Sequence, residues 1–262
     1  METLKRKSVV YLALAHATLL ESMRRKDLYV AGILAVLMIG TAATVGSFGV
    51  KGIELFLKDV ALTVINLLSV VLAVLFAARQ IPEEVSHRTV YPLLARPISR
   101  GDLLFGKYLG ALALSVIGLL IFAAVGAGAL AYYGLTLGGI FWQFLLLRVL
   151  ALAVVVAMTM ALSLVMTPGA TVTLALLLTI GSATFSGAVK LLVPGSSPAQ
   201  QILLKGAYYV LPQLNLFDLT KKVSYGWQPV AGWAMGTLTV YALLFVALFL
   251  ALGALRFRRQ AL

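Results

Sequence analysis

The sequence has 262 residues, of which 61% are hydrophobic and only 11% are charged, and its mean hydropathy is +1.02. Soluble domains are about half apolar and about a quarter charged, so this composition excludes a water-soluble fold and favours one membrane domain over residues 1–262. The formal net charge of +12 does not indicate a nucleic-acid partner, because the basic residues flank apolar stretches, where they set topology and contact anionic lipids.

Residue types that hold metals are scarce. The chain has no cysteine, and its two histidines, His16 and His87, are far apart in the sequence. Thiolate and imidazole metal sites are therefore not expected. We assign no catalytic residue and expect no cofactor bound by this chain.

Residues 1–27 are predicted to form an amphipathic helix in the membrane interface. Its apolar face carries Val9, Leu12, Leu19, Leu20 and Met23. Its opposite face carries Lys7, Thr18, Ser22 and Arg25. His16 interrupts the apolar pattern. A signal peptide is the weaker interpretation of the same segment.

Six segments are long and apolar enough to cross a bilayer, which takes about 20 residues. They are residues 28–48, 60–78, 108–131, 140–162, 170–193 and 230–252. Because these runs lack the alternation of a barrel strand, all six are expected to be helices. The predicted fold class is an all-α membrane protein with six transmembrane helices.

Lys and Arg gather in residues 1–26, in residues 79–107 and at the C-terminus. With an even number of spans, these three regions lie on one side of the membrane. The positive-inside rule makes that side the cytoplasm. Both termini are therefore expected to be cytoplasmic.

The segment 79–107, between spans two and three, is too long and polar for a simple turn. Glu83 and Glu84 are predicted to begin a short amphipathic helix with a favourable acidic first turn. Ser99 and Asp102 match a capping box that starts the third span. A rigid segment of this kind suits a docking surface, and an ordinary solvated loop is the alternative.

Residues 101–107 fit most of a phosphate-binding loop, with Gly101, Gly106 and Lys107 at the required spacing. Tyr108 stands where a hydroxyl should hold magnesium, and no strand precedes the run. We interpret it as the start of a membrane helix. Any ATP must then be bound by another protein.

Polar residues within the spans are the remaining candidates for a site. Asn66 and Arg148 are candidates for a pathway or a dimer seam, although helix packing explains Asn66 equally well. Arg148 and Lys190 both lie close enough to the outer surface for their charges to reach water, and we favour that interpretation. In the external loop 194–229, residues 199–211 are expected to form a short helix that re-enters or lies on the outer leaflet.

Several short blocks resemble the type-2 permeases of ATP-binding cassette (ABC) transporters, in particular those associated with maturation of multicopper enzymes such as nitrous-oxide reductase. The main block comprises Glu84-Val-Ser-His-Arg88-Thr89, Leu93-Leu94-Ala-Arg96-Pro97-Ile-Ser99-Arg100 and Gly106-Lys107-Tyr-Leu-Gly110. Two further blocks are residues 21–29, with Glu21, Arg24 and Arg25, and residues 211–219. The resemblance covers most of the chain in architecture.

This resemblance implies an exporter permease in a bacterial or archaeal plasma membrane, paired with a second copy or a homologous permease. A separate ABC ATPase subunit would bind ATP and magnesium. Glu83, Glu84, Arg88 and Thr89 would lie on or next to its docking surface. Leu94, Arg96 and Pro97 would fix the angle of the coupling helix, Ser99 and Arg100 would begin the third span, and residues 1–27 would form the elbow helix. A membrane-embedded lipid-modifying enzyme and a non-transporting assembly subunit are the alternative functions.

Overall fold

The computed structural model describes residues 11, 13–18, 33, 37, 40, 44, 53–86, 99–193 and 197–259. Every regular element within these ranges is a helix, in agreement with the predicted all-α class. The predicted first span, residues 28–48, lies outside the described residues apart from four helical positions.

The described elements follow one another with short connections. They are α3 (Ile53–Ser86), α5 (Arg100–Tyr132), α6 (Ile140–Ser163), α7 (Pro168–Leu192), α8 (Pro198–Val210), the 3-10 helix η2 (Leu214–Phe217), α9 (Thr220–Ser224) and α10 (Gly232–Arg259). Among the described residues, four helices are long and apolar enough to cross a membrane, namely α3, α5, α6 and α10. Six spans therefore remain a prediction.

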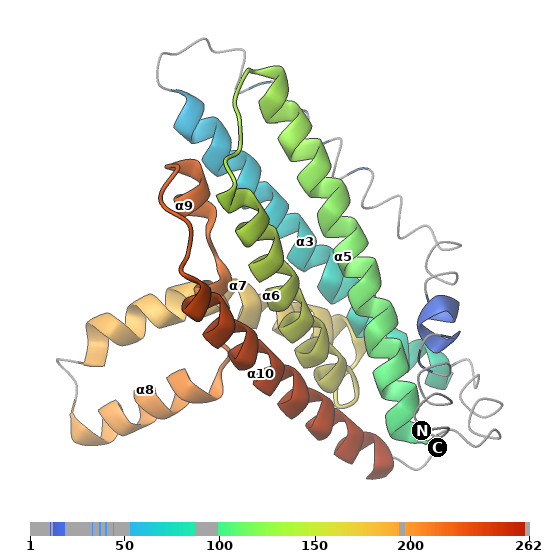
Figure 1. The fold of residues 1–262 in the computed structure, drawn as a ribbon. Coiled ribbons are helices and arrows are strands. Elements are labelled where there is room, and N and C mark those ends of the chain that lie inside the picture. Colours follow the sequence, from blue (N-terminus) through green and yellow to red (C-terminus); the bar gives the residue numbers. More distant parts are fainter. Residues whose placement is uncertain are drawn as a thin grey trace.

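Helices α3, α5 and α6 pack against one another, and α10 crosses the face made by α5 and α6 (Figure 1). The α3–α5 contact depends on a small residue. A Cβ atom at Gly118 of α5 would lie 2.1 Å from Cδ2 of Leu72 on α3. Glycine therefore lets the two helices approach closely, as is common between membrane helices.

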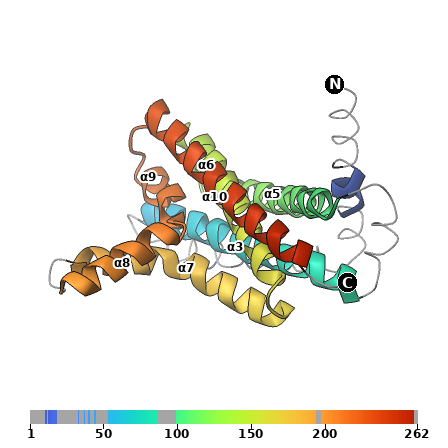
Figure 2. The ribbon, with the colours of Figure 1, turned by 90° about the horizontal axis from the view of Figure 1, so that it is seen from below.

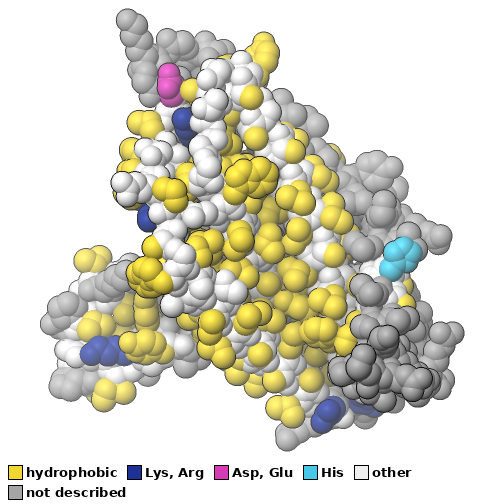
Figure 3. Space-filling view, in the orientation of Figure 1, with side chains coloured by type: hydrophobic (Ala, Val, Ile, Leu, Met, Phe, Trp, Pro, Cys, Tyr) yellow, Lys and Arg dark blue, Asp and Glu magenta, His cyan; other side chains and the backbone are white. Residues whose placement is uncertain are grey.

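The second half of α7 and all of α8 project from one side of this bundle (Figures 1 and 2). Large apolar side chains remain exposed on them, among them Leu191, Leu192 and Ile202. The outer face of α10 is also apolar, and Figure 3 shows a broad hydrophobic surface with Lys and Arg at its margins. Such surfaces suit a lipid environment.

The predicted helix starting at Glu83 and Glu84 is wrong. Both residues belong to the last turns of α3, which runs without interruption from Ile53 through Pro82 to Ser86. Proline removes only one intrahelical donor, and Ile81 is buried on the bundle, so packing extends the helix past it. Residues 87–98, including the predicted break at Pro92, lie outside the described residues.

The described part of the N-terminal segment is helical and packs along the first turns of α5. Leu14 lies over Gly106, and Thr18 lies over Gly110, where an added Cβ would come within 2.7 Å and 2.6 Å of them, respectively. Thr18, which the sequence places on the polar face, is fully buried and donates a hydrogen bond to the Leu14 carbonyl. The threonine satisfies its hydroxyl locally, so it can pack where only apolar residues were expected.

Candidate functional site at the converging helix ends

The start of α5 is fixed by its own sequence. The Ser99 hydroxyl accepts a hydrogen bond from the Asp102 backbone nitrogen at 3.1 Å, and an Asp102 carboxylate oxygen accepts one from the Ser99 backbone nitrogen at 3.2 Å. This reciprocal pairing is the predicted capping box. It begins α5 eight residues before the predicted span and places residues 101–107 inside a helix, which confirms our interpretation of the phosphate-loop match.

Arg100 joins the start of α5 to the end of α10. One guanidinium nitrogen donates to the backbone carbonyls of Phe257 and Arg258, at 2.9 Å and 3.3 Å. The guanidinium also lies 5.9 Å from the centroid of the Phe257 ring. The last carbonyls of a helix lack intrahelical donors and carry partial negative charge, so a cation here stabilises the end of α10.

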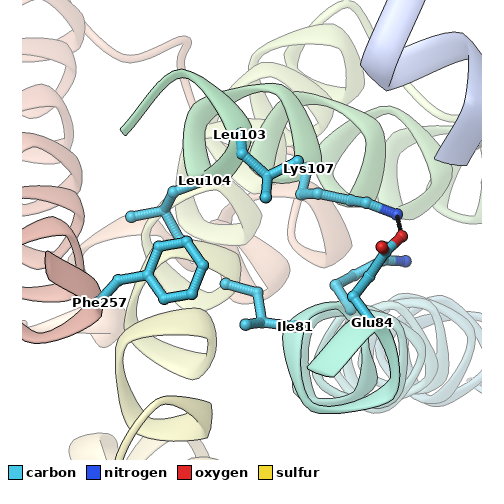
Figure 4. Close-up of a pocket in the computed structure, with 7 residues that line it drawn as sticks. Ile81, Glu84, Leu103, Leu104, Lys107 and Phe257 are labelled. Atoms are coloured by element: carbon cyan, nitrogen blue, oxygen red, sulfur yellow. Dashed lines mark ion pairs between the residues drawn. The ribbon is translucent and has the colours of Figure 1, made fainter. Parts of the chain in front are cut away.

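Glu84 at the end of α3 forms an ion pair with Lys107 of α5, with the two charged atoms 2.5 Å apart. Figure 4 shows the two side chains reaching toward each other beside the apolar side chains of Ile81, Leu104 and Phe257. Only 6% of the Lys107 side chain and 14% of the Glu84 side chain are exposed. Because water screens this pair weakly, it holds the two helix ends together more firmly than a surface pair would.

The N-terminal helix contacts the same region. The Tyr11 hydroxyl donates to an Asp102 carboxylate oxygen at 2.6 Å, and its ring packs edge-on against Phe105 at 5.1 Å. The hydrogen bond to the carboxylate raises the pKa of Tyr11, because ionised tyrosine could not donate it. Asp102 thus serves both the cap of α5 and the attachment of the N-terminal helix.

The structure brings together only part of the predicted coupling set. Glu84, Ser99 and Arg100 lie at the converging helix ends, and the backbone of Glu83 lies beside them in α3. The other predicted residues lie outside the described residues: Arg88, Thr89, Leu94, Arg96 and Pro97 of the coupling segment, and Glu21, Arg24 and Arg25 of the elbow. Their roles remain predictions.

Sequence reasoning missed the two residues that complete this region. In the sequence, Lys107 belongs to the phosphate-loop match and to the block that resembles ABC permeases, and Phe257 lies in a basic tail that indicates topology. A lysine beside an apolar run is a signal that a partner carboxylate is needed. Which carboxylate supplies it depends on α3 continuing past Pro82, and the sequence did not indicate that.

Asn66 and Arg148 do lie together, but inside the protein. Arg148 of α6 is only 7% exposed, and its guanidinium donates to the Ser69 hydroxyl of α3 at 3.2 Å and to the Asn66 carbonyl. The expectation that Arg148 reaches water is therefore wrong, because α3 supplies the acceptors that water would otherwise provide. The side chain of Lys190 lies outside the described set, so its exposure remains a prediction.

Two comparisons bear on the chain as a whole. A family model described as ABC-2 family transporter protein matches residues 9–262. No curated protein matches the sequence. The matched region includes both the converging helix ends and the Asn66–Arg148 contact. Among the described residues, no group of three His, Cys, Asp or Glu side chains could hold a metal ion.

Proposed function

Because the chain belongs to the ABC-2 family of transporter proteins, we propose that it is the membrane-spanning permease subunit of an exporter driven by a separate ABC ATPase subunit. ATP and magnesium bind that partner. The complete transporter contains a second copy of the chain or a homologous permease in a bacterial or archaeal plasma membrane, with both termini in the cytoplasm.

The observation that supports this proposal is that a single connection joins two long helices, α3 and α5. Residues 87–99 join the end of α3 to the start of α5. With 34 residues, α3 is about 51 Å long at 1.5 Å per residue. A force applied to this connection acts directly on two helices that reach across the membrane.

The polar contacts at these ends support such transmission. The Glu84–Lys107 pair makes α3 and α5 move together, and the bonds from Arg100 add α10 to the same unit. An ATPase that docks on residues 87–99 therefore displaces three spans as one body. Rigid-body movement of packed helices is a common way to convert a local event into a distant one.

The experiment uses the permease and its ATPase reconstituted together in proteoliposomes. Lys107→Met leaves the ATPase intact but frees α3 from α5, so ATP turnover should continue while transport falls. Glu54→Gln is the matched control, because Glu54 is an exposed carboxylate at the opposite end of the same helix. A permease that neither binds an ATPase nor transports anything when ATP is supplied would refute the proposal.

Within the family, we infer a place among the permeases that serve multicopper-enzyme maturation. The support is the likeness of residues 84–89, 93–100 and 106–110 to those proteins. Deleting the gene and measuring the copper content and activity of the host's multicopper enzymes tests this assignment. Normal copper loading would leave a general exporter and remove the specialised role.

A further inference from the structure

The connection between α8 and α10, residues 211–231, is partly buried in the bundle: residues 212–214, 217, 219–220 and 223–224 are buried, and residues 225–229 are exposed. Its two short helices, η2 and α9, pack against α3, α6 and α7. Phe217 is fully buried, and Leu214, Thr220, Val223 and Ser224 are also buried. We name residues 211–231 the α8–α10 connection. Its burial requires contacts that replace water around its polar groups.

Both ends of this connection are tied to neighbouring spans. The Gln213 backbone nitrogen donates to the Tyr241 hydroxyl of α10 at 2.8 Å. At the other end, the Gln143 side chain of α6 accepts from the Val230 nitrogen at 2.8 Å and donates to its carbonyl at 3.2 Å. These neutral bonds fix where the connection enters and leaves the bundle.

The middle of the connection is held by a charged group. One Asp218 carboxylate oxygen accepts hydrogen bonds from the Thr220 nitrogen at 2.9 Å and the Thr220 hydroxyl at 2.6 Å. The same oxygen accepts from the Asn66 amide of α3 at 3.1 Å, and that amide also donates to the Thr220 hydroxyl at 3.1 Å. Asp218 therefore shapes the start of α9 and attaches it to α3.

Asn66 faces Arg148 through its backbone. The guanidinium of Arg148 donates to the Asn66 carbonyl and to Ser69, and the side-chain amide of the same Asn66 donates to Asp218. A buried cation in a membrane protein needs a counter-charge. The carboxylate linked to Arg148 through Asn66 belongs to a segment with no long helix of its own.

We propose that Asn66, Arg148 and Asp218 form a latch that holds the α8–α10 connection inside the bundle and releases it as a unit. When the connection lifts, the Asn66 amide loses both acceptors, and Arg148 loses its link through Asn66 to the carboxylate, while Asp218, which is already exposed, gains water. The polar cost of release therefore falls on α3 and α6, and the apolar cost falls on Leu214, Phe217 and Val223, which belong to the hydrophobic core. A shift between α3 and α6 also weakens the latch, because Asn66 of α3 is bonded both to Arg148 of α6 and to Asp218 of the connection.

The latch is mechanically continuous with the converging helix ends. Asn66 and Ser86 lie on the same helix, 20 residues or about 30 Å apart. On the proposed function, movement of the α3 end by the ATPase shifts Asn66 relative to Arg148 and frees the connection. The latch then acts as a gate at the opposite end of the protein, and this last step alone rests on the proposed function.

The absence of cysteine from the chain gives a direct test. Val223→Cys places a single thiol on the buried face of α9, and its reaction with a water-soluble maleimide in nanodiscs reports release. Asp218→Asn or Asn66→Leu should raise this rate about tenfold, which corresponds to losing one charged hydrogen bond. Asn215→Ala, at an exposed position of the same connection, is the control.

A second substitution separates a latch from general loosening. In an Arg148→Met background Asn66 has lost its bond to α6, so Asp218→Asn should raise the labelling rate much less than it does alone. Equal increases in both backgrounds would overturn a latch in which the three residues act together. So would an unchanged rate in Asp218→Asn and Asn66→Leu proteins that elute as single species.

Hydrogen exchange on the unsubstituted chain covers the case in which these variants fail to fold. Amides of residues 220–224 should exchange at least about tenfold faster than those of residues 144–156 in α6, because the connection opens without the bundle. Equal exchange in both would refute separate release. Adding ATP and the partner ATPase should increase Val223→Cys labelling; no increase, in a complex that still transports, would refute the gating step but not the exporter function.

Discussion

The molecule contains two polar clusters, and each stabilises a buried cation in a different way. At the converging helix ends, Lys107 is neutralised by direct contact with Glu84. In the interior, Arg148 donates hydrogen bonds to two neutral acceptors, the Ser69 hydroxyl and the Asn66 carbonyl, and the Asp218 carboxylate of a separate segment is linked to it through the Asn66 amide. A direct pair binds two helices permanently, whereas a distributed arrangement can be opened by moving one short segment. The direct pair is suited to transmitting force, and the distributed arrangement is suited to responding to it.

Removing the carboxylate of the direct pair should have the largest effect on stability. Glu84→Gln leaves Lys107 buried without its counter-charge, and the cost should be about 3 kcal/mol, the lower end for breaking a buried pair. Thermal unfolding in detergent should show a clear drop in Tm. Most of the loss should return in Glu84→Gln/Lys107→Met, which removes both charges; no recovery would mean that the pair does not set stability.

The protein should lose less stability when the interior cluster is changed but its positive charge is kept. Arg148→Lys preserves the cation but cannot reproduce the two bonds to Asn66 and Ser69, so about 1.5–3 kcal/mol should be lost with the charged hydrogen bond. Thermal unfolding under the same conditions measures the difference. A loss greater than that of Glu84→Gln would reverse the comparison between the two clusters.

The capping box at the start of α5 should contribute less again. Ser99→Ala removes the side-chain acceptor for the Asp102 nitrogen and should cost about 1 kcal/mol. Ser99→Asp should retain most of the cap and serves as the control. If alanine and aspartate had equal effects on Tm, the hydrogen bond of the cap would not account for the stability of this end.

The smallest effect is expected at Tyr11 and depends on pH. Its pKa is raised by the bond to Asp102, so this contact is fully present below the ordinary tyrosine pKa of 10.0 and is lost as pH rises through the higher folded value. Limited proteolysis of residues 11–18 should accelerate in that alkaline range. Tyr11→Phe should show faster cleavage at neutral pH and no further alkaline step from this site.

Part of this arrangement was predictable because it depends on neighbours in the sequence. The capping box needs only Ser99 and Asp102, three residues apart, and it lies where the sequence predicted. The fourth span was predicted at residues 140–162 and forms Ile140–Ser163, because a long apolar run that follows two glycines leaves little choice. The helix expected in residues 199–211 is α8, Pro198–Val210.

The errors arise where distant segments supply the missing partner. Glu84 ends a helix and does not begin one, because α5 offers Lys107 and apolar cover beyond Pro82. Arg148 is buried because α3 presents a carbonyl and a hydroxyl at the right height. The sequence predicted that residues 199–211, which form most of α8, re-enter the membrane or lie on the outer leaflet. The buried part is the later stretch around Phe217.

The sequence by itself determined that this is a membrane protein, that it is built from helices and that it resembles the ABC-2 transporter family. These properties follow from apolar length, charge distribution and short motifs, all of which are local. Only the tertiary structure decided which charges meet, because a buried cation accepts any suitable partner that the packing brings within reach. For that reason Lys107 forms an ion pair with Glu84, and Arg148 donates a hydrogen bond to Asn66, whose amide in turn bonds to Asp218.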